Sequence, residues 1–225
     1  MPLAPVVHVE RMLRIQGYSN VTSVRPAIQR AAAAMAQLAT RLSEPRVAYR
    51  AMAVRGLNGG VLEIEGGFRF HCDAFDRTLK GCTEVTPFVL TVGKALDDRV
   101  IKLVEAGDLL EALLLETAGW LCIEDATRQF KTRLRDQTLA RGCRITSRLG
   151  PGYSYRIGEV TCIWSLEEQA TLFAAFDGAQ LPVSLMASAA MQPKMSRSGL
   201  FGVAPLPAAR AAAHAAEPLR IIPAA

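Results

Sequence analysis

The chain alternates between segments with apolar residues at helical spacing and segments with continuous or alternating apolar residues. Residues 9–16 and the segment after Ser23 are of the first kind, because residues three, four or seven apart share one side of a helix. We predict a short helix ended by Gly17, then a longer helix with Ser23 as its N-cap and Pro26 in its first turn. The apolar stripe of the longer helix is Ile28, Met35, Leu38 and Leu42.

The following segments have the pattern of strands. Residues 46–55 and 61–65 flank an Asn58-Gly59-Gly60 turn, which predicts two strands joined as a hairpin. Residues 85–92 are strongly apolar without alternation, so we expect a strand that is buried on both faces. Shorter strands are predicted at residues 68–71, 145–148, 183–186, 189–192 and 198–203.

The longest helical pattern covers residues 94–131, with a break at Gly107 and with Asp108 as the cap of its second part. Its expected core face consists of Leu110, Leu113, Leu114 and Leu121. A mixture of helices with strands that are joined by short turns indicates the α+β class. Because Ala and Pro dominate after residue 203, we predict one domain over residues 1–203 and a flexible tail over residues 204–225.

Composition narrows the class of protein. Of 225 residues, 50% are hydrophobic, which is enough for a sizeable core. The formal charge of +5 is dispersed along the chain, so we expect no nucleic-acid partner. The five cysteines form no CxxC pair, and the three histidines have no triad or metal-ligand spacing; we therefore expect no metal site, no catalytic residue and a cytoplasmic protein with reduced thiols. The absence of a signal sequence and of a long uncharged apolar stretch argues against a membrane partner.

The most unusual local segment is Arg148-Leu149-Gly150-Pro151-Gly152-Tyr153, which follows a predicted strand. Two glycines around a proline form a stiff turn whose backbone can approach a ligand closely, so that main-chain groups of Gly152 can pair with it. Arg148 can hold a carboxylate, and the ring of Tyr153 can attract a cationic group. These groups suit a ligand that carries both charges. Met186, Met191 and Met195 are expected to fill gaps beneath this site.

The same turn resembles the R-x-x-P-G-Y signature of the activation domain of cobalamin-dependent methionine synthase. The resemblance is strongest to short stand-alone relatives of that domain that accompany corrinoid methyltransferases. Further matching pieces occur in the same order: residues 16–18, 79–82, 91–93 and 164–169, then Leu185, Ser188, Met191, Pro193, Ser196, Ser198 and Gly199. The similarity therefore runs from about residue 9 to residue 203.

The resemblance implies a mainly antiparallel curved sheet flanked by helices, and a site for S-adenosylmethionine. The implied site residues are Arg148, Gly150, Pro151, Gly152 and Tyr153, with Glu124 as the helix carboxylate that faces the ligand. It further implies reactivation of cobalamin carried by a corrinoid-binding protein or methionine synthase subunit. The electron would come from a donor such as a flavodoxin, a ferredoxin or an iron-sulfur protein.

The chain departs from the family pattern at several places, one of which is Glu116, where the relatives often have aspartate. Ala187 stands where the relatives have glutamate, and extra residues that include Tyr155, Arg156 and Glu159 separate Tyr153 from Trp164. These departures support a second interpretation, in which the chain docks on a corrinoid protein without binding S-adenosylmethionine. An ordinary small-molecule methyltransferase is disfavoured, because its alternating β–α pattern and Gly-rich loop are missing.

Overall fold

The computed structural model describes residues 2–206 and the backbone of residues 220–222. The described α-helices are α1 (Val9–Ile15), α2 (Pro26–Leu42), α3 (Ala74–Thr78), α4 (Ala95–Glu105), α5 (Leu109–Ala140) and α6 (Gln169–Ala174). Three short 3₁₀ helices are η1 (Val21–Ser23), η2 (Glu65–Gly67) and η3 (Leu166–Glu168). Ser23 belongs to η1, which Asn20 caps, so its prediction as the N-cap of α2 is wrong; Arg25 occupies that position.

The strands form one large antiparallel sheet and two small hairpins. They are β1 (Arg46–Tyr49), β2 (Met52–Asn58), β3 (Val61–Ile64), β4 (Arg69–His71), β5 (Glu84–Thr91), β6 (Cys143–Ile145), β7 (Ser154–Ile157), β8 (Val160–Ile163), β9 (Ser184–Leu185), β10 (Met191–Gln192), β11 (Ser196–Pro205) and β12 (Arg220–Ile222). The sheet order is β12-β1-β5-β2-β3-β4, and β11 pairs with β5 and with β6. The predicted α+β class with a mainly antiparallel sheet is confirmed.

Strand β5 is the centre of the sheet, and every one of its residues is buried, as the sequence predicts. Two strands, β1 and β2, occupy one of its edges, where a single strand over residues 46–55 was expected. The interruption at residues 50–51 lies opposite Pro87, between the pairs Tyr49–Phe88 and Met52–Val85. Proline has no N–H to donate to a neighbouring strand, so the ladder is weakest at this point.

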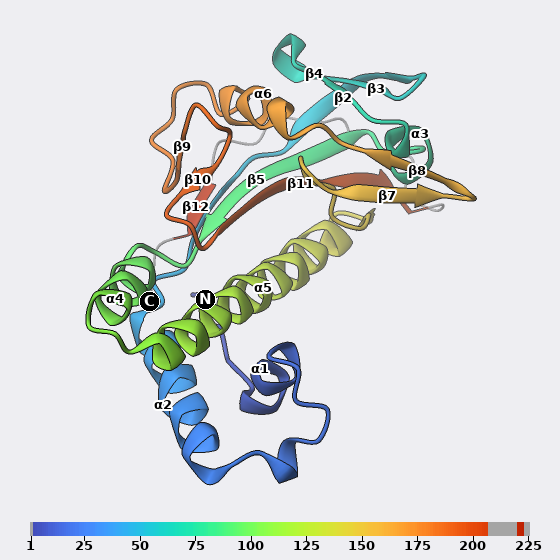
Figure 1. The fold of residues 1–225 in the computed structure, drawn as a ribbon. Coiled ribbons are helices and arrows are strands. Elements are labelled where there is room, and N and C mark those ends of the chain that lie inside the picture. The colour runs from blue at the N-terminus through green and yellow to red at the C-terminus, as the bar shows by residue number, and fades with distance from the viewer. Residues whose placement is uncertain (1, 207–219, 223–225) are drawn as a thin grey trace.

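The helices and the sheet form two hydrophobic cores, one on each face of β5. Residues such as Phe88 and Leu90 pack with α1, α2, α4 and α5, whereas Val89 packs with Trp164 and with residues of α3 and α6. Figure 1 shows α5 running beneath the sheet and α6 lying above it. Successive residues of a strand point to opposite faces, so β5 alone supplies both cores.

Helix α5 follows a short break at Gly107, whose φ of 82° suits a residue without a side chain. It continues to Ala140 without interruption. Leu114 and Leu121 are buried as expected, but Leu110 and Leu113 are 43% and 51% exposed, so their assignment to the core is wrong. A helix packs with one side only, and these two leucines lie on the other side. None of the helices in residues 2–206 combines the length and apolar character needed to cross a membrane.

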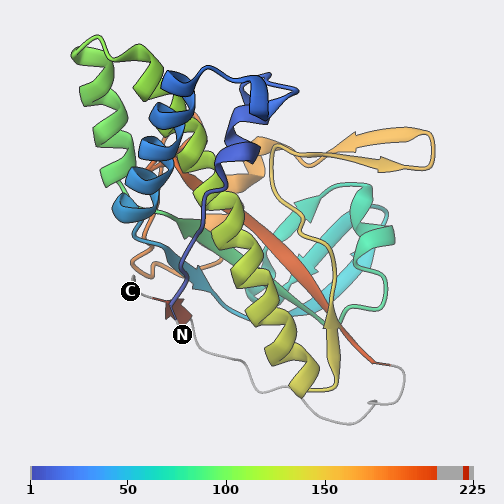
Figure 2. The same cartoon turned by 90° about the horizontal axis from the view of Figure 1, so that it is seen from below.

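Residues 154–163, predicted only as extra residues, form the hairpin β7–β8. Figures 1 and 2 show it projecting beyond the large sheet. In the predicted tail, β11 continues to Pro205 and β12 pairs with β1. Residues 207–219 and 223–225 of that tail lie outside the described residues, so the division at residue 203 stays a prediction.

Candidate ligand-binding site at the 148–153 turn

The 148–153 turn is attached to strand β11 by two hydrogen bonds. The Leu149 N–H donates to the Leu200 carbonyl at 3.0 Å, and the Leu200 N–H donates back at 2.8 Å. The turn and strand β11 approach each other closely because the residue of β11 at this contact is Gly199, which has no side chain. A Cβ atom on Gly199 would lie 2.2 Å from the Leu149 carbonyl oxygen, which no side chain can tolerate. A glycine at position 199 is therefore a condition for the turn.

Gly150 and Pro151 are buried inside the turn, where they shape it. The Gly150 N–H donates to the Tyr155 hydroxyl at 2.7 Å, and that hydroxyl donates to the Gly150 carbonyl at 3.0 Å. A Cβ on Gly150 would lie 2.6 Å from Nη1 of Arg148. Both main-chain polar groups of Gly150 thus have hydrogen-bond partners within the protein. Because Gly150 has no side chain, it leaves room for the guanidinium of Arg148.

Gly152 has a φ of 80°, which favours glycine. Its N–H donates to the Trp164 carbonyl at 2.7 Å, and the Trp164 N–H donates to the Tyr153 carbonyl at 3.1 Å. These bonds close the base of the β7–β8 hairpin. Because Trp164 already accepts the Gly152 N–H, a ligand could use that group only by displacing it.

Arg148 and Tyr153 lie together, but they contact each other. The guanidinium carbon of Arg148 is 4.3 Å from the centre of the Tyr153 ring, a cation–π arrangement. Nη1 of Arg148 also donates to the Ser198 carbonyl at 3.2 Å. Tyr153 is 43% exposed, so its side chain remains accessible at the surface. Arg148 therefore occupies the position over the ring that a ligand cation would also favour.

Glu124 reaches the same neighbourhood from helix α5. Its carboxylate forms an ion pair with Arg11 of α1 at 2.5 Å. It also stabilises the charge of Arg197, a residue of β11 that interacts with both Arg148 and Tyr153. The described interactions of Glu124 are thus with Arg11 and, electrostatically, with Arg197, and none of them joins Glu124 directly to the turn. Whether these residues bind a ligand stays a prediction.

Arg197 is a residue of this cluster that the sequence analysis missed. Burial lowers the pKa of its guanidinium, and the neighbouring Arg148 lowers it further, while Tyr153 and Glu124 act in the opposite direction. The available signal was a single arginine between the two small residues Ser196 and Ser198, within a strand that is otherwise apolar.

Residues of the 164–169 and 196–199 segments contact each other on the buried side of the 148–153 turn. The Ser198 hydroxyl donates to Oε1 of Gln169 at 2.9 Å, while the Ser198 carbonyl accepts from Arg148. Glu168 accepts hydrogen bonds from the Trp164 indole and from the His71 N–H. The positions of these two segments that match the family pattern therefore support the turn from its buried side.

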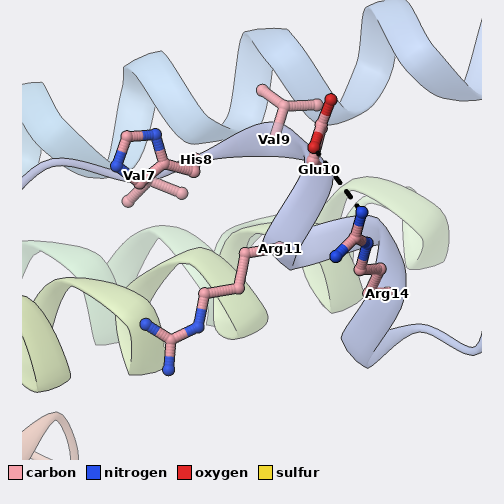
Figure 3. A pocket seen from close by; sticks show the side chains of 6 residues that line it. All are labelled: Val7, His8, Val9, Glu10, Arg11 and Arg14. Atoms are coloured by element: carbon pink, nitrogen blue, oxygen red, sulfur yellow. Dashed lines mark ion pairs between the residues drawn. The ribbon is translucent and has the colours of Figure 1, made fainter.

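Two pockets in the described residues are lined by other parts of the chain. One, of about 530 Å³, is lined by Val7, His8, Val9, Glu10, Arg11 and Arg14. Figure 3 shows Glu10 paired with Arg14 in this pocket, while Arg11 points away from that pair. Arg11 thus connects the pocket to Glu124. Residues 2–206 contain no group of three or more His, Cys, Asp or Glu that could hold a metal ion.

The second pocket, of about 400 Å³, adjoins α4, α5 and β10, and none of the predicted site residues lines it. Met186, Met191 and Met195 do line it. Met186 is 50% exposed, and Met195 is buried against Gly119 of α5. Met191 packs against the core that contains Leu149 of the turn, whereas Met195 belongs to the core beneath α5. The expectation that these methionines fill gaps beneath the turn stays a prediction.

Comparisons with known proteins support the fold. No family model matches the chain, and no curated protein matches its sequence. Among solved structures, the class that matches is a domain with a mainly antiparallel sheet flanked by helices. One such structure is the MetH reactivation domain with AdoHcy bound, at a TM-score of 0.61 and 16% identity, over 90% of this chain and 71% of that one. At this identity the likeness shows a shared fold.

Proposed function

We propose that the chain binds S-adenosylmethionine at the 148–153 turn and serves as the reactivation module of a corrinoid methyltransferase. The observation that supports this proposal is the pairing of Arg148 with Tyr153, beside an Arg197 on which Glu124 acts electrostatically, in a fold shared with a reactivation domain. The predicted site residues come from α5 and from the turn, 24 or more positions apart in sequence, so their relative positions depend on the fold.

The residues present fit such a ligand. Its carboxylate suits the guanidinium of Arg148, its amino group suits the carboxylate of Glu124, and its sulfonium suits the ring of Tyr153. When bound, S-adenosylmethionine supplies an electrophilic methyl group. The protein's own contribution is to hold and orient the ligand, and none of these residues needs to move a proton.

The acceptor in this proposal is cobalamin on a partner, most simply another subunit of a split cobalamin-dependent methionine synthase. An electron donor such as a flavodoxin, a ferredoxin or an iron-sulfur protein would reduce the inactive corrinoid before it is methylated. We place this system in the cytoplasm, in keeping with the five free cysteines, none of which forms a disulfide within residues 2–206.

A docking protein that binds no S-adenosylmethionine is the second candidate. The observation that favours it is that the turn is internally satisfied: Arg148 covers Tyr153, while Tyr155 and Trp164 take the main-chain groups of the two glycines. The two functions differ in a single measurable property, the binding of S-adenosylmethionine by the isolated chain or by its complex with a corrinoid protein.

Calorimetric titration with S-adenosylmethionine tests the proposal. We expect the wild type to bind, and a variant with both Arg148→Ala and Tyr153→Phe to bind more weakly by about 1–3 kcal/mol, because a charge-assisted contact is lost. Arg156→Ala is the matched control, since Arg156 bonds only to Gly158 within the exposed hairpin. Absence of binding by the wild type, even with a corrinoid protein present, would replace this function by docking.

A further inference from the structure

The charges around the turn are unbalanced. Glu124 acts electrostatically on Arg197, and Arg148 is a second cation that acts on Arg197. Glu124 already forms a 2.5 Å ion pair with Arg11 of α1. Arg197 therefore has only part of one negative charge to balance it, with the positive charge of Arg148 nearby. Like charges repel, so two such groups side by side favour a bound anion.

The strand register fixes where Arg197 points. Arg197 pairs with Leu90 of β5, whose side chain belongs to the core beneath α5. Directly paired residues in an antiparallel sheet place their side chains on the same face. The Arg197 side chain therefore extends toward α5, where Glu124 lies, and it is only partly exposed.

Arg148 reaches the same place from the other direction. Its guanidinium donates to the carbonyl of Ser198, the residue next to Arg197, and lies over the Tyr153 ring. The Tyr153 side chain also acts electrostatically on Arg197, in the direction that favours its charged form. Tyr153 is thus a neighbour of both guanidinium groups, with that of Arg148 over its ring.

We infer that Arg197 is a further ligand-contacting residue, which together with Arg148 forms a two-arginine clamp for the carboxylate of the ligand. This inference rests on the proposed function. A guanidinium presents several N–H donors in one plane, so two of them can surround both oxygens of a carboxylate. Because Arg197 is shielded from solvent, its attraction to an anion is screened less than that of an exposed arginine.

The ligand's carboxylate can be removed chemically, which allows a direct test. We would titrate S-adenosylmethionine and its decarboxylated analogue into the wild type, Arg197→Gln and the control Arg156→Gln. We expect Arg197→Gln to weaken S-adenosylmethionine binding by about 10-fold to 100-fold, the effect of losing a hydrogen bond to a charged group. Binding of the decarboxylated analogue should change by less than about 3-fold in the same variant.

Each alternative result has a distinct meaning. If Arg197→Gln weakens the binding of both compounds equally, Arg197 only supports Tyr153, and the inference of a clamp is wrong. If the wild type binds both compounds equally well, the site has no carboxylate subsite, and the clamp is again wrong. If the wild type binds neither compound, the proposed function itself fails and the clamp fails with it. Arg197→Lys, which keeps the charge, provides a second variant should the glutamine variant unfold. It too should weaken the binding of S-adenosylmethionine more than the binding of the decarboxylated analogue.

Discussion

Gly199 shows how much of this site depends on single atoms. We predict that Gly199→Ala lowers the free energy of unfolding by about 1–3 kcal/mol more than Gly17→Ala, because a methyl group would overlap the Leu149 carbonyl. Gly17 is the matched control, since it also has a positive φ but no atom within 4 Å of the added Cβ. Chemical denaturation of the two variants measures the difference. Equal losses would mean that β11 and the turn separate without cost.

Whether a site residue could be predicted from the sequence depends on how far away its partners lie along the chain. Arg148 and Tyr153 are five positions apart, so their proximity follows from the turn itself. Tyr155 and Arg197 could not be assigned from the sequence, because each acts through pairing that only the folded strands define. Glu124 came from the family resemblance, and its placement near the turn depends on how α5 packs beneath the sheet.

At the scale of elements, helix α5 anchors the segment that precedes α1. The Asp125 carboxylate accepts from the Val6 N–H at 3.0 Å, and Gln129 exchanges two hydrogen bonds with Ala4. We predict that Asp125→Asn lowers the free energy of unfolding by about 1–3 kcal/mol and speeds amide exchange at Val6, because a bond to a charged group is weakened. Asp136→Asn, an exposed change on the same helix, should have little effect. An unchanged exchange rate at Val6 would show that the Asp125 bond does not hold the segment in place.

The Asp125 contribution also depends on pH in a defined direction. Burial raises the pKa of this carboxyl, but hydrogen bonds from Arg128, the Val6 N–H and Gln129 outweigh burial and lower it overall. A group with a lower pKa in the folded state stabilises the protein above its unfolded pKa of about 3.9. That stability is lost as the pH falls through the folded pKa. The difference between the wild type and Asp125→Asn should therefore shrink below about pH 4.

Long and strongly patterned elements could be predicted from the sequence, and short or exposed ones could not. The buried strand β5 and the helix α2 have patterns that leave little choice of structure. The β7–β8 hairpin was missed because each strand has only four residues and none of its side chains is fully buried. The division of β1 from β2 depends on a proline in another strand, which a local pattern does not report.

For the whole molecule, the shared strand β5 predicts one cooperative unfolding transition. Leu90 and Leu200 are fully buried in the two different cores, so replacing either with Ala should lower the free energy of unfolding by about 2–5 kcal/mol. In a Trp120→Phe background, Trp164 fluorescence reports the upper core of Figure 1, and far-UV circular dichroism reports mainly the helices below it. The two signals should change together in both variants. Separate transitions would show that the cores unfold independently.

The double hydrogen bond between Tyr155 and Gly150 has a consequence for how such a chain can evolve. The hairpin that carries Tyr155 is a surface extension, of the kind that is commonly lengthened or trimmed without harm. Here the hairpin also stabilises the turn to which it is attached, through the two hydrogen bonds of Tyr155. A lineage that shortened it would have to find another partner for the Gly150 main chain, so hairpin and turn are expected to be inherited as one unit.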